Sequence, residues 1–246
     1  MTTGTLYGVG LGPGDPELVT LKAARLIAAA PVVAHFRKRG RAGHARTIAS
    51  SLIPAAAIEA AFEYPVTTEV DFREEAYVCS IRDFYSASAD ALKGHLDEGR
   101  DVALLCEGDP FFYGSFLHMY DRIKASHPVV VVPGITGMSG CWTATGQPIT
   151  WGDDVLSVLM ATLPEADLAR QIATSDAVVI MKTGRNLPRI RAALTTAGRL
   201  EAAFIVEQGT MPGQQVTRLV DYAPETCGYF SIVLVHGHGR RPGGAP

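Results

Sequence analysis

Residues 9–18 read VGLGPGDPEL, and with the residues before them they place a glycine at every second position. These glycines are Gly8, Gly10, Gly12 and Gly14. A dinucleotide-binding loop needs G-x-G-x-x-G after a strand, but Pro13 or Asp15 stands where the last glycine belongs. Asp15 would also repel a phosphate, and Pro13 and Pro16 lack the N–H groups that bind phosphate oxygens. The stretch therefore predicts a strand followed by a loop that closely approaches something other than a phosphate.

The segments around this loop predict an α/β fold. Short apolar strands alternate with helical patterns, the first helix being expected over residues 15–30 with Asp15 as its cap and Pro16 in its first turn. The expected strands are 5–11, 31–36, 101–109 and 128–134, and the other helices are 72–99 and 116–126. Continuous apolar strands separated by helices are typical of a mostly parallel sheet covered on both faces.

The second half of the chain predicts a mixed sheet. Strands are expected at 154–161, 176–182 and 202–209, and then at 214–223 and 227–237. The last two leave little room for a helix between them, so they are predicted to pair antiparallel. We expect an N-terminal α/β domain over residues 1–122, a C-terminal α/β domain over 123–240 and a flexible tail over 241–246. A ligand is expected in a trough between the domains, beyond the carboxyl ends of the strands.

The composition excludes several classes of protein. The 246 residues are 47% hydrophobic, which supports a substantial core, and a net charge of -3 gives no sign of nucleic-acid binding. Four widely spaced cysteines indicate buried thiols in a reduced cytoplasm, and the chain shows neither a signal peptide nor a membrane-spanning run. His236 and His238 stand in Gly-rich, basic surroundings that predict a flexible tail, so no metal site is expected.

Four further loops follow expected strands: CEGDPFFYGS, PGITGMSG, MKTGRN and EQGTMPGQQV. Singly, each fits an ordinary role, with Gly108, Gly134 and Gly209 as turn glycines, Asp109 as a cap and Met181 as a core residue. Together they offer backbone donors and acceptors, an apolar wall and few cations. That combination favours a neutral or zwitterionic ligand carrying an adenine and an amino acid.

These motifs, in this order and spacing, resemble the tetrapyrrole methylases over essentially the whole chain, to about residue 236. The resemblance implies a homodimer of two-domain α/β chains that uses S-adenosylmethionine, releases S-adenosylhomocysteine and needs no metal. The segments TMPGQ, MKTGRNLP and YFSIVLV are similar to the branch that methylates precorrin-2 at carbon 20 in cobalamin biosynthesis. Cobalt-factor II or another corrin intermediate remains an alternative substrate. Ribosomal RNA methylation, a nucleotide-binding oxidoreductase and a non-catalytic binding module are further alternatives.

The resemblance also implies roles for particular residues. Those expected to bind the cofactor are Pro13, Glu107, Gly108, Asp109, Phe112, Thr136, Gly137, Met181 and Gly209. Many relatives that methylate uroporphyrinogen have Gly-Gly-Asp-Pro where this chain has an additional carboxylate at Glu107, which weakens a direct transfer of roles from them.

Methyl transfer to a meso carbon of the tetrapyrrole must be followed by loss of a proton, so a general base is expected. The candidates are His35, Glu107 and Asp15, each of which also fits a core or capping role. Residues 37–46, RKRGRAGHAR, contain no acid. Guanidinium groups bind carboxylates in pairs, so this run is predicted to hold the carboxylates of the tetrapyrrole, with Lys38 facing water. The residues expected to do so are Arg37, Arg39, Arg41 and Arg46. A solvated loop without a partner is the alternative.

Overall fold

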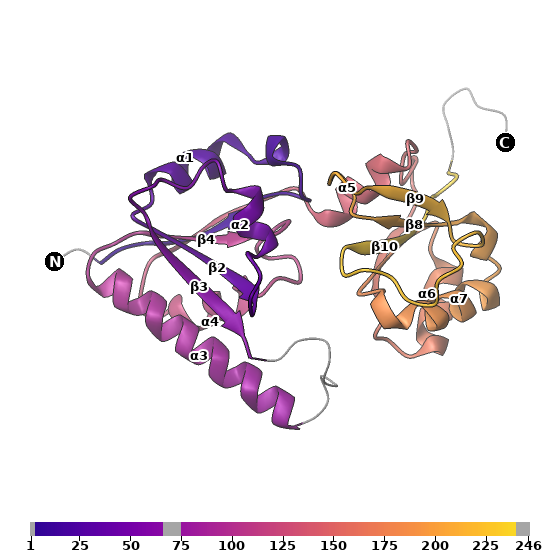
Figure 1. The fold of residues 1–246 in the computed structure, drawn as a ribbon. Helices are drawn as coiled ribbons and strands as arrows, with labels where there is room; N and C mark the ends of the chain where they lie inside the picture. Colours follow the sequence, from indigo (N-terminus) through magenta and orange to yellow (C-terminus); the bar gives the residue numbers. More distant parts are fainter. Residues whose placement is uncertain (1–2, 66–74, 240–246) are drawn as a thin grey trace. The chain divides into compact units, whose positions relative to one another are not determined.

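The computed structural model describes residues 3–65 and 75–239 (Figure 1). The chain divides into two compact units, Met1–Thr136 and Gly137–Pro246. The division falls later than the boundary predicted between residues 122 and 123. The reason is that β5 (Val129–Val132) pairs with β1 (Leu6–Gly10), so the last predicted strand of the first half completes the first sheet.

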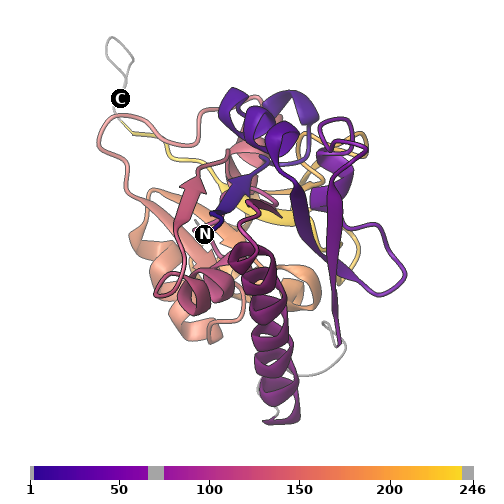
Figure 2. The ribbon, with the colours of Figure 1, turned by 90° about the vertical axis from the view of Figure 1, so that its left-hand side faces the viewer.

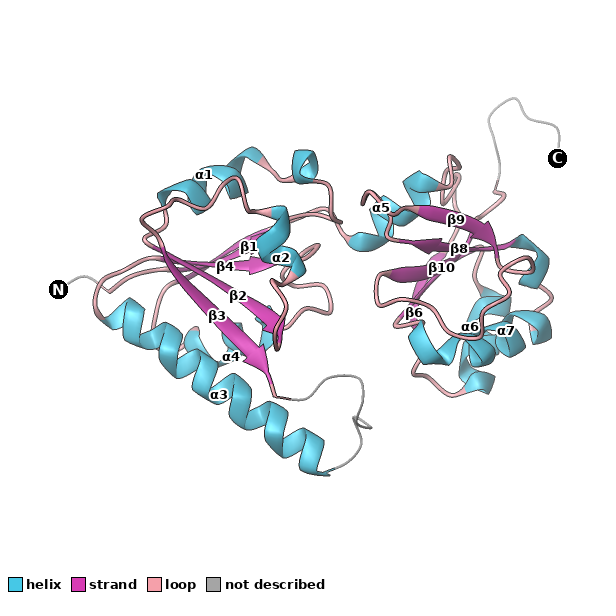
Figure 3. Cartoon of the chain, viewed as in Figure 1, coloured by secondary structure: helices cyan, strands magenta, loops and turns pink. Residues whose placement is uncertain are grey.

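The first unit contains a five-stranded sheet in the order β3-β2-β4-β1-β5, with every pairing parallel. Figure 3 labels β1, β2, β3 and β4 of this sheet. The other strands are β2 (Val32–Lys38), β3 (Ile58–Tyr64) and β4 (Val102–Cys106). This confirms the expected parallel sheet. The edge strand β3 escaped prediction because its alternation, IEAAFEY, mixes glutamates with small and aromatic residues.

Helices cover both faces of this sheet (Figures 1 and 2). The helices α1 (Leu21–Ala29) and α2 (His44–Ile48) pack on the face that carries Val33 and Leu105. The helices α3 (Glu75–Asp97) and α4 (Phe116–Ile123) pack on the face that carries Ala34 and Leu104. Alternate residues of each strand thus enter two cores, and each fully buried leucine or isoleucine contributes roughly 1.5–3 kcal/mol.

The predicted helix over residues 15–30 is divided in two. Asp15 caps only a short 3-10 turn, η1 (Pro16–Leu18), by accepting a 2.9 Å hydrogen bond from the Glu17 N–H. The helix α1 has its own cap, because the hydroxyl of Thr20 accepts a hydrogen bond from the Ala23 N–H. The prediction was wrong at this end because a second N-cap residue, Thr20, was overlooked.

The second unit contains a mixed sheet in the order β6-β7-β10-β8-β9. Its strands are β6 (Leu156–Met160), β7 (Ala177–Met181), β8 (Ala203–Glu207), β9 (Gln215–Arg218) and β10 (Ser231–Val235). A mixed sheet was expected, but the predicted pairing of the last two strands is wrong. Both β9 and β10 pair antiparallel with β8, one on each side, because β10 fits between β7 and β8.

Helices also cover both faces of the second sheet. The helices α6 (Glu165–Thr174) and α7 (Leu187–Thr196) share one core, and α5 (Gly137–Ala144) lies in the other. Two 3-10 turns, η2 (Gly184–Asn186) and η3 (Leu200–Ala202), flank α7. Within residues 3–65 and 75–239, no helix is long and apolar enough to span a membrane.

The segment after β10 is part of the fold as far as the structure describes it. His236 is buried, its Nδ1 lying 3.0 Å from the carbonyl oxygen of Pro148 and its Nε2 3.1 Å from the hydroxyl of Thr145. Gly237 donates to the carbonyl of Ile149. The interpretation of the HGHG segment as a flexible tail was therefore wrong. The predicted tail over residues 241–246 lies outside the described residues.

Candidate functional site

At the carboxyl ends of the first sheet, neighbouring strands continue toward opposite faces. The strands β1 and β2 continue into helices on one face, whereas β4, which lies between them, continues into α4 on the other. Open α/β sheets bind ligands outside the carboxyl ends of strands at such a switch point. The predicted loops of this unit, at residues 10–15, 106–115 and 133–136, all follow strands at this edge.

The first glycine loop approaches the protein's own backbone. A Cβ atom at Gly10 would lie 2.6 Å from the amide nitrogen of Gly134 and 2.8 Å from the carbonyl oxygen of Gly108. Gly12 and Gly108 exchange two backbone hydrogen bonds, of 2.8 and 3.3 Å. A side chain at Gly8 would overlap the ring of Phe116. The glycines thus let the loops after β1, β4 and β5 pack against one another.

Asp109 fastens two of these loops together. One carboxylate oxygen accepts a hydrogen bond from the Phe111 N–H at 2.9 Å, and the other accepts one from the Gly134 N–H at 3.0 Å. Both bonds support the capping role rather than a side-chain contact with a ligand. Nearby, Pro13 is buried and Phe112 is half-buried, with its ring 4.9 Å from that of Tyr113.

Glu107 is the most strongly perturbed carboxyl of this edge. The residue is exposed, and partial desolvation of its carboxyl group by neighbouring protein atoms raises its pKa to about 7. A hydrogen bond from the Ala45 N–H, in the first turn of α2, lowers this pKa and so opposes the effect of desolvation. The carboxyl therefore exchanges its proton near neutral pH while part of the residue stays accessible.

His35 occupies a buried position without partners. It is 2% exposed, and neither ring nitrogen has a hydrogen-bond partner among the described residues. Burial lowers the pKa of the imidazole; Glu59 raises it, and Arg37 and Arg46 lower it further. The ring is therefore neutral at neutral pH, with one donor and one acceptor unused. The third candidate base, Asp15, is half-buried and caps η1.

The basic run over residues 37–46 is partly neutralised within the molecule. Arg37 forms a 2.8 Å ion pair with Glu63, and Arg46 binds Glu59 through two hydrogen bonds of 2.8 and 2.9 Å. Both glutamates lie on β3, the strand that was not predicted. Among the described residues, Arg39 and Arg41 form no ion pair, and Lys38 is exposed as expected. These two arginines remain available for an external carboxylate.

The candidate residues of the second unit differ in what surrounds them. Gly137 begins α5, immediately after the half-buried Thr136, and a Cβ atom there would meet nothing within 4 Å. Met181 is half-buried at the end of β7. Gly209 is buried, and a Cβ atom there would lie 2.9 Å from the Cys141 sulfur. Gly209 therefore makes room for α5, whereas the space beside Gly137 is open.

Backbone strain gathers in the same loops. Residues other than glycine with positive φ occur after β4, β7 and β8. They are Tyr113 (55°), Lys182 (56°), Gln208 (51°) and Thr210 (67°). Such conformations are unfavourable for residues with a Cβ, persist only where the surroundings hold them, and cluster at binding sites. Gln208 is held in part by a 2.7 Å hydrogen bond from its N–H to the carbonyl of Phe230.

A polar network that the sequence analysis missed connects these loops. The buried hydroxyl of Thr183 donates to the carbonyl of Ser231 at 2.9 Å, and the Cys227 thiol donates to the Thr183 hydroxyl at 3.2 Å. The hydroxyl of Ser231 donates to a carboxylate oxygen of Glu207 at 3.3 Å. The network joins the loop after β7, the end of β8 and the start of β10. These contacts are long-range in sequence, so no local motif predicts them.

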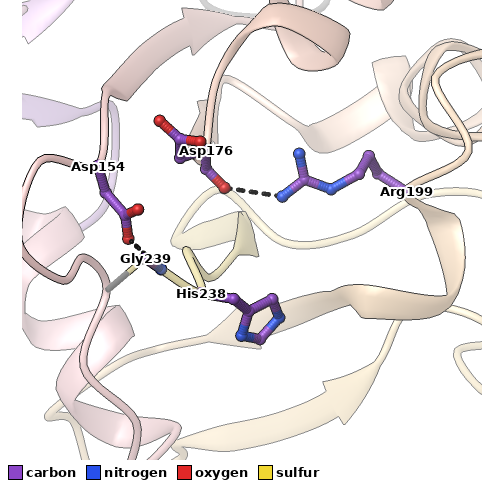
Figure 4. Close-up of a pocket in the computed structure, with 5 residues that line it drawn as sticks. All are labelled: Asp154, Asp176, Arg199, His238 and Gly239. Atoms are coloured by element: carbon purple, nitrogen blue, oxygen red, sulfur yellow. Dashed lines mark hydrogen bonds between the residues drawn. The ribbon is translucent and has the colours of Figure 1, made fainter. Parts of the chain in front are cut away.

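A pocket of about 240 Å³ lies in the second unit, at the amino ends of β6 and β7, and is lined by the residues shown in Figure 4. Asp154 and Asp176 precede β6 and β7, at the amino ends of these strands. Arg199 donates to the carbonyl of Asp176 at 2.8 Å. The pocket is thus separate from the predicted cofactor loops, which follow strands. No cluster of three potential metal ligands occurs among the described residues.

The chain is similar to known proteins in sequence and in fold. The family model for tetrapyrrole (corrin/porphyrin) methylases matches residues 5–220. A precorrin-2 C(20)-methyltransferase from a Sinorhizobium species is 52% identical over 97% of this chain and 98% of its own length. A cobalt-precorrin-2 C(20)-methyltransferase from Salmonella typhimurium is 26% identical over 95% and 96%.

A solved structure shares the fold. It is a uroporphyrin-III C-methyltransferase from Thermus thermophilus complexed with S-adenyl homocysteine, and it is 23% identical to this chain. It superposes with a TM-score of 0.65 over 95% of this chain and 92% of its own.

Proposed function

The chain belongs to the tetrapyrrole (corrin/porphyrin) methylases, and we propose that it transfers a methyl group from S-adenosylmethionine to carbon 20 of precorrin-2. The observation that carries this proposal is the 52% identity to a precorrin-2 C(20)-methyltransferase over nearly the full length of both chains. The enzyme that acts on the cobalt form is 26% identical over a similar length, which favours the metal-free substrate. The product is precorrin-3A.

The residues that would hold S-adenosylmethionine fit a zwitterionic ligand with an adenosine. Gly137 leaves open space at the start of α5, and Met181 offers a half-buried thioether at the end of β7. Backbone of the loop over residues 107–112, with Pro13, Phe112 and Thr136, completes the proposed set. Asp109 and Gly209 support the site without contacting the cofactor in this proposal. Asp109 hydrogen-bonds the Gly134 N–H, and the missing side chain of Gly209 leaves space for Cys141 of α5. S-adenosylmethionine supplies an electrophilic methyl group on a sulfonium.

The chain's own contribution to the reaction is alignment and exclusion of water. An in-line displacement needs the acceptor carbon and the methyl donor held in position more than it needs covalent help. The interlocked loops after β1, β4 and β5 are suited to this because backbone hydrogen bonds and the Asp109 carboxylate fix them. Arg39 and Arg41, with Arg37 and Arg46, bind the carboxylates of the tetrapyrrole in our proposal.

Incubation with precorrin-2 and S-adenosylmethionine labelled in the methyl group tests the function directly. We expect mass spectrometry to show one added methyl and NMR to place it at carbon 20. Uroporphyrinogen III and cobalt-factor II serve as control substrates in the same assay and should turn over at least tenfold more slowly. Absence of labelled product from precorrin-2, or methylation at another carbon, would contradict the proposal.

We also propose a cytoplasmic homodimer. The proposal rests on the resemblance to the family and on exposed apolar side chains such as Leu21, Val155 and Tyr229. Sedimentation at micromolar concentration should give about twice the chain mass of 26.2 kDa. A single species at the chain mass would exclude the dimer.

A further inference from the structure

The strands β2 and β4 separate at their carboxyl ends, and two titratable side chains stand at the separation. Their pairing ends with Ala34 opposite Leu104, although both strands continue beyond these residues. His35 follows the last pair on β2, and Glu107 follows β4 directly. The short helix α2 contacts both strands here. The segment after β2 leads to a helix on one face of the sheet, and the segment after β4 leads to a helix on the other face. Open α/β sheets bind ligands at such positions.

Both side chains contact the first turn of α2. The Ala45 N–H donates a hydrogen bond to the Glu107 carboxyl. A Cβ atom at Gly43 would lie 3.3 Å from Cδ2 of His35, so the imidazole lies directly under the same turn. Glu107 is an exposed residue, so a ligand can reach its side chain from outside without opening the fold.

We infer that Glu107 is the general base that removes the proton from carbon 20 of the tetrapyrrole. This inference rests on the function proposed above. As the bond between carbon 20 and the methyl group forms, the bond from that methyl to sulfur breaks and its electron pair stays on sulfur. The C–H bond at carbon 20 then breaks, its electrons return to the conjugated ring system, and the proton moves to the Glu107 carboxylate.

Glu107 suits this role better than the other two candidates. A general base is most effective when its pKa lies near the working pH, and burial brings the pKa of Glu107 to about 7. The lowered pKa of His35 makes its imidazole a weaker base. One carboxylate oxygen of Asp15 is occupied by the cap of η1.

The surroundings of Glu107 leave its carboxyl free to titrate. On β4, desolvation and the charge of Glu107 raise the pKa of the half-buried Cys106 thiol. The titratable groups on the elements around the carboxyl are His35, Arg37 and Lys38 of β2, His44 and Arg46 of α2, and Asp109 on its own loop. Arg37 and Arg46 are bound to Glu63 and Glu59, so neither is a fixed counter-ion for Glu107.

The test compares Glu107→Gln with the wild type and with Asp101→Asn. Asp101 stands before the other end of β4, where its carboxylate accepts a 2.7 Å hydrogen bond from the Thr5 N–H, a bond that an amide oxygen can also accept. We expect E107Q to bind S-adenosylmethionine within about twofold of the wild type by calorimetry, while kcat falls roughly 100-fold or more. The loss of kcat below about pH 7 should vanish in E107Q and persist in D101N.

Two readouts separate a base from a structural residue. With precorrin-2 deuterated at carbon 20, the isotope effect on kcat should rise in E107Q, because proton removal becomes rate-limiting. In the free protein, infrared difference spectra should show a carboxyl that titrates near pH 7 in the wild type and is missing in E107Q. An E107Q enzyme with wild-type kcat, or with its acid limb intact, overturns the inference. If the wild type itself fails to methylate carbon 20, the proposed function fails first, and the infrared titration still reports on Glu107.

Discussion

In the first unit, the loops after β1, β4 and β5 turn at glycines whose missing side chains leave room for protein atoms. In the second unit, the loops after β7 and β8 turn at Lys182, Gln208 and Thr210, which carry side chains at positive φ. The first arrangement is an interlocked frame, since Gly10 cannot accept even a methyl group. In the second unit the strained turns carry side chains, and a Cβ atom at Gly137, the first residue of α5, would meet nothing within 4 Å. Regular glycine spacing in a sequence can therefore mark internal packing, and a glycine beside open space need not belong to the conspicuous repeat.

The largest effect on stability should come from adding a side chain at Gly10, where the loops after β1, β4 and β5 pack together. Gly10→Ala places a methyl group against backbone atoms of Gly134 and Gly108, which cannot rotate away, so we expect the free energy of unfolding to fall by about 3 kcal/mol. Urea unfolding measures this. Gly94→Ala in α3 is the control, because its Cβ meets nothing within 4 Å, and it should gain roughly 0.5–1 kcal/mol. Equal stability of the two variants would refute the interlocked frame.

The second effect concerns Gly137 and should appear in binding rather than in stability. Gly137→Val adds a side chain in open space, so we expect unfolding to change by less than about 1 kcal/mol. The affinity for S-adenosylmethionine should fall at least tenfold, which corresponds to about 1.4 kcal/mol. Calorimetry checks the affinity, and Gly137→Ala should give a smaller loss. Gly108 is a poorer probe of the same idea, because its φ of 66° makes any side chain there strained. Wild-type affinity in folded G137V would show that the ligand does not approach this residue.

The third effect follows from the raised pKa of Glu107. The folded protein keeps this proton up to about pH 7, whereas the unfolded chain releases it near the ordinary glutamate pKa of about 4.5. The folded state therefore binds more protons between these values, and stability falls as pH rises through this window. Because the residue is partly exposed, we expect roughly 1 kcal/mol rather than the full value of the shift. Wild type and E107Q are compared by urea unfolding at pH 5 and pH 8. A constant difference between them would contradict the shift.

Local patterns predicted the two α/β halves, because strand and helix periodicities are properties of neighbouring residues. They also predicted loops at the carboxyl ends of strands, since Gly and Pro mark chain reversals. What depends on distant residues was missed. The edge strand β3 supplies Glu59 and Glu63, which neutralise Arg46 and Arg37. β10 fits between β7 and β8, and Cys141 fills the space at Gly209. The burial that shifts the pKa values of Glu107 and His35 arises only when α2 packs over β2 and β4.

The smallest expected effect separates the paired from the unpaired arginines of residues 37–46. Arg39→Ala combined with Arg41→Ala removes the two guanidinium groups that form no ion pair with the described residues, so a tetrapyrrole carboxylate loses a partner that was not already occupied. We expect the KM for precorrin-2 to rise about three- to tenfold at low ionic strength, and less at high salt, because exposed charges are screened. The value of kcat and the affinity for S-adenosylmethionine should stay the same, since these side chains contribute equally to binding before and during the reaction.

Arg37→Ala and Arg46→Ala should each raise this KM less than the double variant, because Glu63 and Glu59 already bind these arginines. Lys124→Ala serves as a charge-matched control. Lys124 follows α4, on the opposite face of the sheet, and is paired with Asp121, so its loss should leave the KM unchanged at every salt concentration. If the double variant keeps the wild-type KM at low ionic strength, these arginines are solvated surface charges. The paired arginines would then have to exchange their glutamate partners for the substrate, and R37A and R46A would show the larger increase in KM.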